Sequence, residues 1–416
     1  MNDMKQTRSG APEPPQYPQR DLSYTFLGLR FENPFILAAA PSTDHLDMVR
    51  RAFSAGWAGA ILKTTSIEGT RVDLAYPMMS TFNHDGKKLF GMGNIDLISE
   101  HHIDRVEENV RQLKKEFPEK IVAASIMAGR KEDWQALVVR LEKAGVDFIE
   151  CSFSCPQGNI GEHPGKMLAQ SINATELTAG WVKEAARRVP ISIKITPHVT
   201  DIVDVANAVK RSGADALTAS NSVQALMGVD IRSFVPFPRL QGRSTYSGLT
   251  GPAIKPITLR TIAEIARHVD IPILGTGGAS TWSDAVEFIS VGAGVVQYCT
   301  AVMHHGFRII DDLRSGMAHY LDEMNFSSVM DIHRKALPHL ADHDGLPRRT
   351  MRSHIHEPLC IGCEACYLAC YDGAHMAIDR RPERVPRVDW DRCVGCGLCE
   401  HVCPVDGCIE MMVKEN

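Results

Sequence analysis

Two closely spaced runs of cysteines near the end of the chain constrain its fold more than any other feature of the sequence. The first run is 360-CIGCEACYLAC-370 and the second is 393-CVGCGLCEHVCP-404. Nine of the 12 cysteines among the 416 residues lie between Cys360 and Cys408. Cysteines concentrated in one short segment favour metal ligation in a reducing compartment over a disulfide framework, so we expect a cytoplasmic protein.

Both cysteine runs follow the pattern C-x2-C-x2-C-x3-C, and Pro404 follows the last cysteine of the second run. This spacing is typical of bacterial two-cluster ferredoxins, in which the fourth cysteine of each run ligates the other cluster. Structural zinc also uses C-x2-C pairs, but it needs only four ligands, so the third cysteine of each run would have no role. The runs therefore predict two [4Fe–4S] clusters in a small α+β, ferredoxin-like domain over residues 351–416. We assign one cluster to Cys360, Cys363, Cys366 and Cys403, and the other to Cys393, Cys396, Cys399 and Cys370.

The larger part of the chain alternates short, β-branched apolar runs with segments of helical periodicity. In residues 132–145, Trp134, Leu137, Val138 and Leu141 follow the spacing i, i+3, i+4 and i+7, and Gly145 is a plausible helix C-cap. Eight strand–helix units over roughly 290 residues predict a (β/α)8 TIM barrel, with a doubly wound sheet as the alternative. The eight apolar runs are residues 35–40, 59–64, 121–126, 146–151, 191–196, 214–219, 271–276 and 294–299.

The rest of the chain and its composition narrow the possible partners. We expect the barrel over residues 22–310, a helical linker over 311–350, and a polar, proline-rich, disordered tail over 1–21 that lacks the apolar segment of a secretory signal. The net charge of −5 offers no basic surface for nucleic acid. No stretch of 18 consecutive apolar residues is present, so we expect no membrane span.

Residues suited to binding a phosphate group lie at the ends of the predicted barrel strands. In this fold, the loops after strands seven and eight usually hold a phosphate, and here they contain Gly277, Gly278, Cys299 and Thr300. The glycines alone could also form a simple tight turn. Clusters carry electrons singly, whereas a flavin can accept single electrons and pass on a hydride, so the combination favours FMN.

Eight motifs, in order along the chain, resemble the dihydropyrimidine dehydrogenases, most closely their NAD-dependent bacterial catalytic subunit. They are NPFILAAAPST (33–43), KTTS (63–66), GNIDLIS (93–99), SFSCPQG (152–158), KITPHVTD (194–201), TASNSVQALMG (218–228), YSGLTG (246–251) and GTGGAST (275–281). The resemblance runs from about residue 22 to residue 413 and implies a dihydroorotate-dehydrogenase-like FMN barrel followed by a two-cluster ferredoxin domain. It implies FMN contacts from Ala38, Lys63, Thr64, Asn94, Lys194, Gly248, Gly277, Gly278, Cys299 and Thr300.

The resemblance also implies that Cys155 is the catalytic general acid, which gives a proton to C5 of a pyrimidine while reduced FMN gives a hydride to C6. A thiol can give up and recover a proton near neutral pH. The alternative interpretation is a small buried thiol, or a structural partner of Cys151. The Gly- and Pro-containing segment 156–165 favours a mobile loop instead.

Lys63 and Lys194 each follow a buried apolar run, where an uncompensated ammonium would be costly. Their alternative interpretation is as surface charges. Placed near a flavin, the two ammonium groups would stabilise the negative charge of the reduced ring.

The implied substrate contacts depart from the family pattern. They are Asn94, Asp96, Ser152, Asn221 and Ser222. Asp96, Ser152 and Ser222 stand where the family has glutamate, asparagine and threonine, and all three are shorter or smaller. A site that loses hydrogen-bond partners loses affinity, so a larger or differently substituted cyclic amide is one interpretation, and drift with waters filling the gaps is the other.

No G-x-G-x-x-G motif follows a predicted strand with an acidic residue about twenty positions later, so we find no nicotinamide site. The resemblance implies a separate FAD and iron–sulfur subunit that oxidises NAD(P)H and passes electrons to the clusters. It also implies a homodimer or a heterotetramer. The leading hypothesis is therefore FMN-dependent reduction of the C5=C6 bond of uracil or thymine. The alternatives are the same reduction of another conjugated cyclic amide or imide, a dihydroorotate-type oxidation, and an electron-carrier subunit without catalysis.

Overall fold

The computed structural model describes residues 20–67, 69, 72–84, 87–154, 167–381 and 385–413. The chain divides into two compact units, Met1–His339 and Leu340–Asn416, each with its own hydrophobic core. Among the helices of the described segments, none combines the length and the apolar character needed to cross a membrane.

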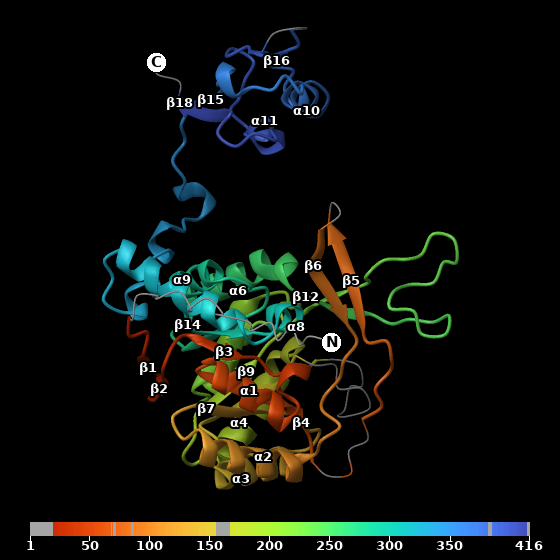
Figure 1. Ribbon diagram of the computed structural model, residues 1–416, viewed down its shortest axis with the longest axis vertical. Coiled ribbons are helices and arrows are strands. Elements are labelled where there is room, and N and C mark those ends of the chain that lie inside the picture. Colours follow the sequence, from red (N-terminus) through yellow and green to blue (C-terminus); the bar gives the residue numbers. More distant parts are fainter. Residues whose placement is uncertain are drawn as a thin grey trace, which may run out of the picture. The chain divides into compact units, whose positions relative to one another are not determined.

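The first unit is built on a closed barrel of eight parallel strands (Figure 1). Neighbouring strands follow the order of the chain, and the last pairs with the first. Each strand overlaps one of the eight apolar runs, so the predicted TIM barrel is confirmed and the doubly wound sheet is excluded. The strands are β3 (Phe35–Leu37), β4 (Gly59–Thr65), β7 (Ile121–Ile126), β8 (Phe148–Ser152), β9 (Ile191–Lys194), β10 (Ala216–Ala219), β13 (Ile273–Thr276) and β14 (Ala293–Tyr298).

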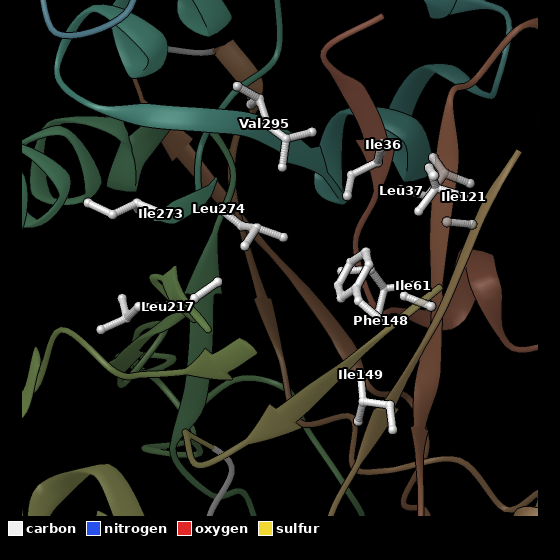
Figure 2. Packing of buried hydrophobic residues seen from close by; sticks show 14 of the residues in the cluster. Ile36, Leu37, Ile61, Ile121, Phe148, Ile149, Leu217, Ile273, Leu274 and Val295 are labelled. Atoms are coloured by element: carbon white, nitrogen blue, oxygen red, sulfur yellow. The ribbon is translucent and has the colours of Figure 1, made fainter. Parts of the chain in front are cut away.

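Helices cover the outside of the barrel and bury one apolar stripe each against the strands. In α3, Trp134, Leu137, Val138 and Leu141 are buried as their spacing predicts, and the helix ends at Gly145, whose φ of 101° is left-handed. Figure 2 shows part of the core, with Ile36 of β3, Ile61 of β4 and Leu274 of β13 among the labelled side chains. The helices of this unit are α1 (Leu46–Ala55), α2 (Ile103–Glu116), α3 (Lys131–Ala144), α4 (Ile172–Ala185), α5 (Ile202–Arg211), α6 (Lys255–His268), α7 (Trp282–Ser290), α8 (Thr300–His305) and α9 (Ile309–Glu323).

Helix α9 begins two residues before the segment 311–350 that the sequence predicts as a linker, and most of it lies in that segment. Its side chains Leu313, Met317 and Leu321 are buried in the same core as the barrel strands. The barrel unit therefore continues past α9 to His339. Short 3₁₀ helices lie at Pro41–Thr43, Leu168–Gln170, Pro252–Ile254, Val329–Asp331, Leu337–His339, His343–Gly345 and Glu357–Leu359.

Two antiparallel elements of the barrel unit were not predicted. β1 (Tyr24–Phe26) and β2 (Leu29–Phe31) form a hairpin near the start of the described chain. β11 (Val223–Ala225), β12 (Ser247–Thr250), β6 (Lys87–Asn94) and β5 (Met79–His84) form a four-stranded sheet in that spatial order (Figure 1). β5 and β6 belong to the connection that follows β4, and β11 and β12 to the connection that follows β10. The sheet joins the two connections and pairs Asn94 with Gly248. It therefore brings predicted site residues together that lie far apart in the sequence.

The second unit is the small α+β domain that the cysteine runs predict. β15 (Met351–Ile355) pairs with β18 (Ile409–Val413), and β16 (Ile378–Asp379) pairs with β17 (Arg387–Val388). The helices are α10 (Ala365–Gly373), which contains Cys366 and Cys370 of the first run, and α11 (Leu398–Val402), which contains Cys399 of the second. Cys408 is buried, as expected of a thiol that belongs to the core.

Candidate active site and cluster cavities

Lys63, at the carboxyl end of β4, is buried and paired with acidic side chains. Its Nζ donates to Oδ1 of Asp96 at 3.0 Å and lies 3.8 Å from Oδ2 of Asp44. Asp44 in turn accepts a hydrogen bond from Ser99 Oγ at 2.5 Å. The ammonium is only 6% exposed, which disfavours the surface-charge interpretation, and its burial is tolerated because the two carboxylates compensate it.

Burial raises the pKa of the Asp96 carboxyl above its ordinary value, and the neighbouring Lys63 ammonium opposes this rise. Asp96 is 10% exposed. The shorter aspartate therefore does not stand free in the pocket, because it is tied to the lysine beside it. This pairing could not be read from the sequence, since Lys63 belongs to barrel strand β4 and Asp96 follows β6, 33 residues later.

Lys194, at the end of β9, has a partner that the sequence analysis missed. Its Nζ donates to Oε1 of Glu150 at 3.3 Å, and Glu150 is fully buried inside the barrel. Oε2 of Glu150 accepts from Thr218 Oγ1 at 3.0 Å and from Gln297 Nε2 at 2.9 Å. All three partners are donors to Glu150, so the network fits a carboxylate and an ammonium that neutralise each other. A glutamate within the apolar run 146–151 was the available signal.

Asn94, Ser222 and Gly248 converge where the antiparallel sheet meets the barrel. Asn94 Nδ2 donates to the carbonyl of Gly248 at 3.0 Å. A Cβ on Gly248 would lie only 2.4 Å from Ser222 Oγ, so glycine is required for this approach. Asn221 Nδ2 donates to the carbonyl of Ser154 at 3.3 Å, which ties the end of β10 to the segment that follows β8.

The remaining predicted contacts lie at the ends of the barrel strands. Ser152 is buried and stands opposite Lys194 in the register of β8 and β9. Thr64 Oγ1 and Ser125 Oγ form a hydrogen bond of 2.9 Å. The Ala38 amide donates to the backbone carbonyl of Tyr298 at 2.9 Å. Cys155, the predicted general acid, and the segment 156–165 lie outside the described residues.

The loops after β13 and β14 carry the predicted phosphate contacts. Gly278 has a φ of 95°, and a Cβ there would lie 2.6 Å from the backbone nitrogen of Lys255 at the start of α6. Gly277 precedes it, and Cys299 caps α8, whose first residue is Thr300. Burial raises the pKa of the Cys299 thiol, while the charge of Lys194 opposes this. Cys299 is therefore close enough to Lys194 to sense its charge.

Unpartnered polar side chains cluster around the same strand ends. Among the described residues, buried side-chain atoms without a hydrogen-bond partner include Oγ of Ser66, Ser154, Ser220 and Ser247, Oγ1 of Thr258 and Oε1 of Gln297. Buried polar groups in native proteins are rarely left unpaired. A cradle of glycines and hydroxyls, with lysines at its wall, therefore fits a polar, phosphate-bearing ligand such as a flavin mononucleotide.

In the second unit, the cysteines line two separate cavities. Cavity I is lined by Cys360, Cys363, Cys366 and Cys403, and also by Cys408. Cavity II is lined by Cys370, Cys393, Cys396 and Cys399. Each cavity includes the four cysteines that the crossed assignment predicts, with the fourth contributed by the other run, and cavity I has Cys408 as a fifth. The ligation of the clusters stays a prediction.

The cavities fit clusters better than single metal ions. Among the described residues, no three His, Cys, Asp or Glu side chains converge closely enough to hold one ion. Burial raises the pKa of the Cys366 thiol to about 11 and also raises the pKa of Cys399. Thiolates at these positions therefore need the positive charge of iron. The Ala377 amide donates to Cys370 Sγ at 3.3 Å, the kind of contact that tunes a cluster.

Comparison with known proteins agrees with both halves of this geometry. Residues 21–321 match the family model described as dihydroorotate dehydrogenase, and residues 353–411 match the model described as 4Fe-4S dicluster domain. The chain belongs to the dihydroorotate dehydrogenase family. Family membership makes it an oxidoreductase that acts on CH–CH groups, with a flavin in the barrel and iron–sulfur clusters in the second unit.

Relatives within the dihydroorotate dehydrogenase family agree with the resemblance read from the motifs. The chain is 37% identical over 406 residues to the NAD-dependent dihydropyrimidine dehydrogenase subunit PreA of Escherichia coli strain K12, covering 94% of this chain and 95% of that protein. It is 33% identical over 341 residues to the chloroplastic dihydropyrimidine dehydrogenase (NADP(+)) of Arabidopsis thaliana, covering 79% and 80%. It is also 33% identical over 326 residues to the catalytic subunit of dihydroorotate dehydrogenase B (NAD(+)) of Pyrococcus horikoshii, covering 76% and 97%.

Proposed function

We propose that the chain is the catalytic subunit of a dihydropyrimidine dehydrogenase, which reduces the C5=C6 bond of uracil or thymine. The observation that carries the proposal is the 37% identity to a dihydropyrimidine dehydrogenase subunit over 94% of the chain, which includes both the barrel and the cluster unit. The dihydroorotate dehydrogenase relative from Pyrococcus horikoshii covers a smaller share of this chain, 76%.

The barrel residues suit FMN as the bound flavin. The backbone at Gly277 and Gly278 and the start of α8 at Thr300 would hold the phosphate. Lys63 and Lys194 would lie beside the ring, each with its charge balanced by Asp96 or Glu150. When bound, FMN would collect electrons singly from the clusters and supply a hydride to C6 of the pyrimidine.

The protein side of the reaction is proton delivery and orientation. Cys155 would give its thiol proton to C5 and recover one from solvent afterwards. Asn94, Asn221 and Ser222 would hold the amide and carbonyl edges of the ring, with Asp96 and Ser152 beside them. The convergence of Asn94 and Ser222 at Gly248, and the bond from Asn221 to Ser154, support this grouping.

The cluster unit would serve as the electron inlet. Eight of the nine cysteines that line cavities I and II, all except Cys408, would hold the two [4Fe–4S] clusters. A partner subunit with FAD and iron–sulfur clusters would oxidise NAD(P)H and reduce them, in a heterotetramer or around a homodimer of this chain. The E. coli relative is named as a subunit, which supports a partner.

A larger or differently substituted cyclic amide is the second candidate substrate. Asp96 is drawn to Lys63 at 3.0 Å, and Ser152 and Ser222 are short, so three family contacts with a pyrimidine would be weaker here. Dihydroorotate-type oxidation is a further alternative, since a dihydroorotate dehydrogenase catalytic subunit aligns with the barrel.

Anaerobic turnover with reduced methyl viologen as the electron donor tests the proposal without the partner subunit. Protein with confirmed FMN and iron would be offered uracil, thymine, orotate and a panel of larger cyclic amides. We expect uracil or thymine to be reduced fastest. Reduction of a larger amide in preference to both pyrimidines would transfer the assignment to the second candidate, and activity confined to the orotate pair would contradict both.

A further inference from the structure

Cavities I and II have matching positions on one sheet, yet their walls differ in polarity. On β15, Ser353 and Ile355 lie two residues apart and therefore on the same face of the strand. Across the sheet, Ser353 pairs with Met411 of β18, and Ile355 pairs with Ile409. The first pair borders cavity II and the second borders cavity I. The same sheet thus presents a hydroxyl to one cavity and only aliphatic groups to the other.

The hydroxyl of Ser353 is positioned on a cluster cysteine. Ser353 is 1% exposed, and its Oγ lies 3.2 Å from Cys399 Sγ, which donates as a thiol. A sulfur bound to iron is a thiolate without a proton, so the Ser353 hydroxyl would then be the donor. Each added electron increases the negative charge on the cluster and its sulfurs. A donor to sulfur therefore favours the reduced form.

The wall of cavity I has no hydroxyl among its described lining residues. Ile355, Ile409, Ile361, Val405 and Pro386 supply apolar surface there. Glu364 adds a carboxylate, which is paired with Arg380 at 2.9 Å. The Cys408 thiol lies beside Cys403 and Cys360 in this cavity, but a thiol is a weaker donor than a hydroxyl. Because Arg380 balances the charge of Glu364, the absence of a hydroxyl is what disfavours reduction in cavity I.

We infer that Ser353 sets the order in which the two clusters are reduced, so that the cluster in cavity II has the higher midpoint potential. The inference deepens the proposed function, since it rests on the electron inlet described above. Each cluster accepts one electron, and the first electron that enters the unit resides in cavity II. Ser353 is therefore a potential-setting residue rather than a ligand.

A redox titration followed by electron paramagnetic resonance tests this order on the full-length holoprotein, with dithionite as reductant. In wild type, we expect two separate one-electron cluster waves. In Cys363→Ala, which removes a ligand of cavity I, the wave that remains should be the one at the higher potential. A remaining wave at the lower potential would overturn the inference.

The Ser353 substitutions provide the second readout. In Ser353→Ala, the ratio of reduced to oxidised cluster at a fixed potential should fall about tenfold for the higher wave alone, which is about 59 mV for one electron. Ser353→Thr keeps the hydroxyl and should restore the wild-type value. The matched control is Ile355→Ala on the same strand, which should leave the higher wave in place. No shift in Ser353→Ala, or a shift of the lower wave, would refute the role of Ser353. Fewer than two cluster waves in wild type would instead overturn the cluster assignment itself.

Discussion

The barrel site and the cluster unit place their functional groups in opposite ways. The cluster cysteines come from two runs of 11 or fewer residues, and the fold only needs to exchange one cysteine between the runs. The barrel site draws on strand ends and excursions from Ala38 to Thr300, and the antiparallel sheet pairs Asn94 with Gly248 across 154 residues. Local spacing therefore determines the metal site, whereas the flavin site depends on long-range pairing and on buried charges. The two units should respond differently to substitution.

The largest expected effect is the loss of a cluster ligand. In Cys363→Ala, iron should fall from about eight to about four atoms per chain, because one of two four-iron clusters is lost. Turnover driven through the clusters should fall on the order of 100-fold while the flavin stays bound, since the inlet is interrupted. Iron analysis, the flavin spectrum and viologen-driven turnover measure the three outcomes.

Cys408→Ala is the matched control for this ligand variant. Cys408 borders the same cavity but is not in the assigned set of eight. It should retain both clusters and near-normal turnover. Equal loss of iron in the two variants would contradict the assignment of Cys408 as a buried thiol that does not ligate a cluster.

Removal of Glu150 should damage the barrel and spare the cluster unit. In Glu150→Ala, the buried Lys194 ammonium loses its counter-charge, and breaking a buried ion pair in this way costs about 3–5 kcal/mol. Urea unfolding followed by the fluorescence of the buried Trp57 and Trp134 should report this loss, with the iron content unchanged.

Glu142→Ala separates this effect from general destabilisation. Glu142 lies on α3 and accepts the backbone amides of Arg187, Arg188 and Val189, at 2.8, 2.9 and 3.2 Å. Its loss should cost about 1–3 kcal/mol and leave the flavin spectrum unaltered. Glu150→Ala should instead alter the flavin spectrum. An unaltered flavin spectrum in Glu150→Ala would argue that the Glu150–Lys194 pair lies away from the flavin.

A methyl group at Gly248 should disturb catalysis more than folding. The new Cβ would lie 2.4 Å from Ser222 Oγ, so the serine must move away from the site. We expect kcat/KM to fall about tenfold to 100-fold in Gly248→Ala, as misplacement of a contact by about 1 Å can cause. Gly180→Ala on α4 has no atom within 4 Å of its new methyl and should be neutral. Equal kinetics in the two variants would remove Ser222 from the substrate contacts.

The smallest expected effect concerns the pH dependence contributed by Asp96. Because burial raises its pKa, the folded protein binds a proton more tightly at this carboxyl than the unfolded chain does. This group therefore lowers the free energy of unfolding as pH rises from about 3.8 through the folded pKa. Asp96→Asn should remove that decrease. Urea unfolding at several pH values would compare the two proteins, and an unchanged slope would show that Asp96 has an ordinary pKa.

The sequence predicts the scaffold better than the chemistry of its interior. All eight strands and the helix 131–144 follow from periodicity, because apolar runs of that length must be buried in a parallel barrel. The hairpin of β5 and β6 and the strands β11 and β12 carry no comparable pattern, since they form a separate antiparallel sheet outside the buried barrel. Asp44 and Glu150 escaped attention for a related reason. A buried carboxylate shows its role only when the fold supplies the lysine it neutralises.

The most direct test of the account is a single oxidative half-reaction, in which the reduced holoprotein passes its electrons to a pyrimidine. The clusters and flavin would be reduced anaerobically with dithionite, the excess removed, and uracil or thymine added in a stopped-flow instrument. The account predicts that flavin and cluster absorbance return together, with one dihydropyrimidine formed for every two electrons lost. Clusters and flavin that stay reduced in the presence of both pyrimidines, with no dihydropyrimidine formed, would contradict it.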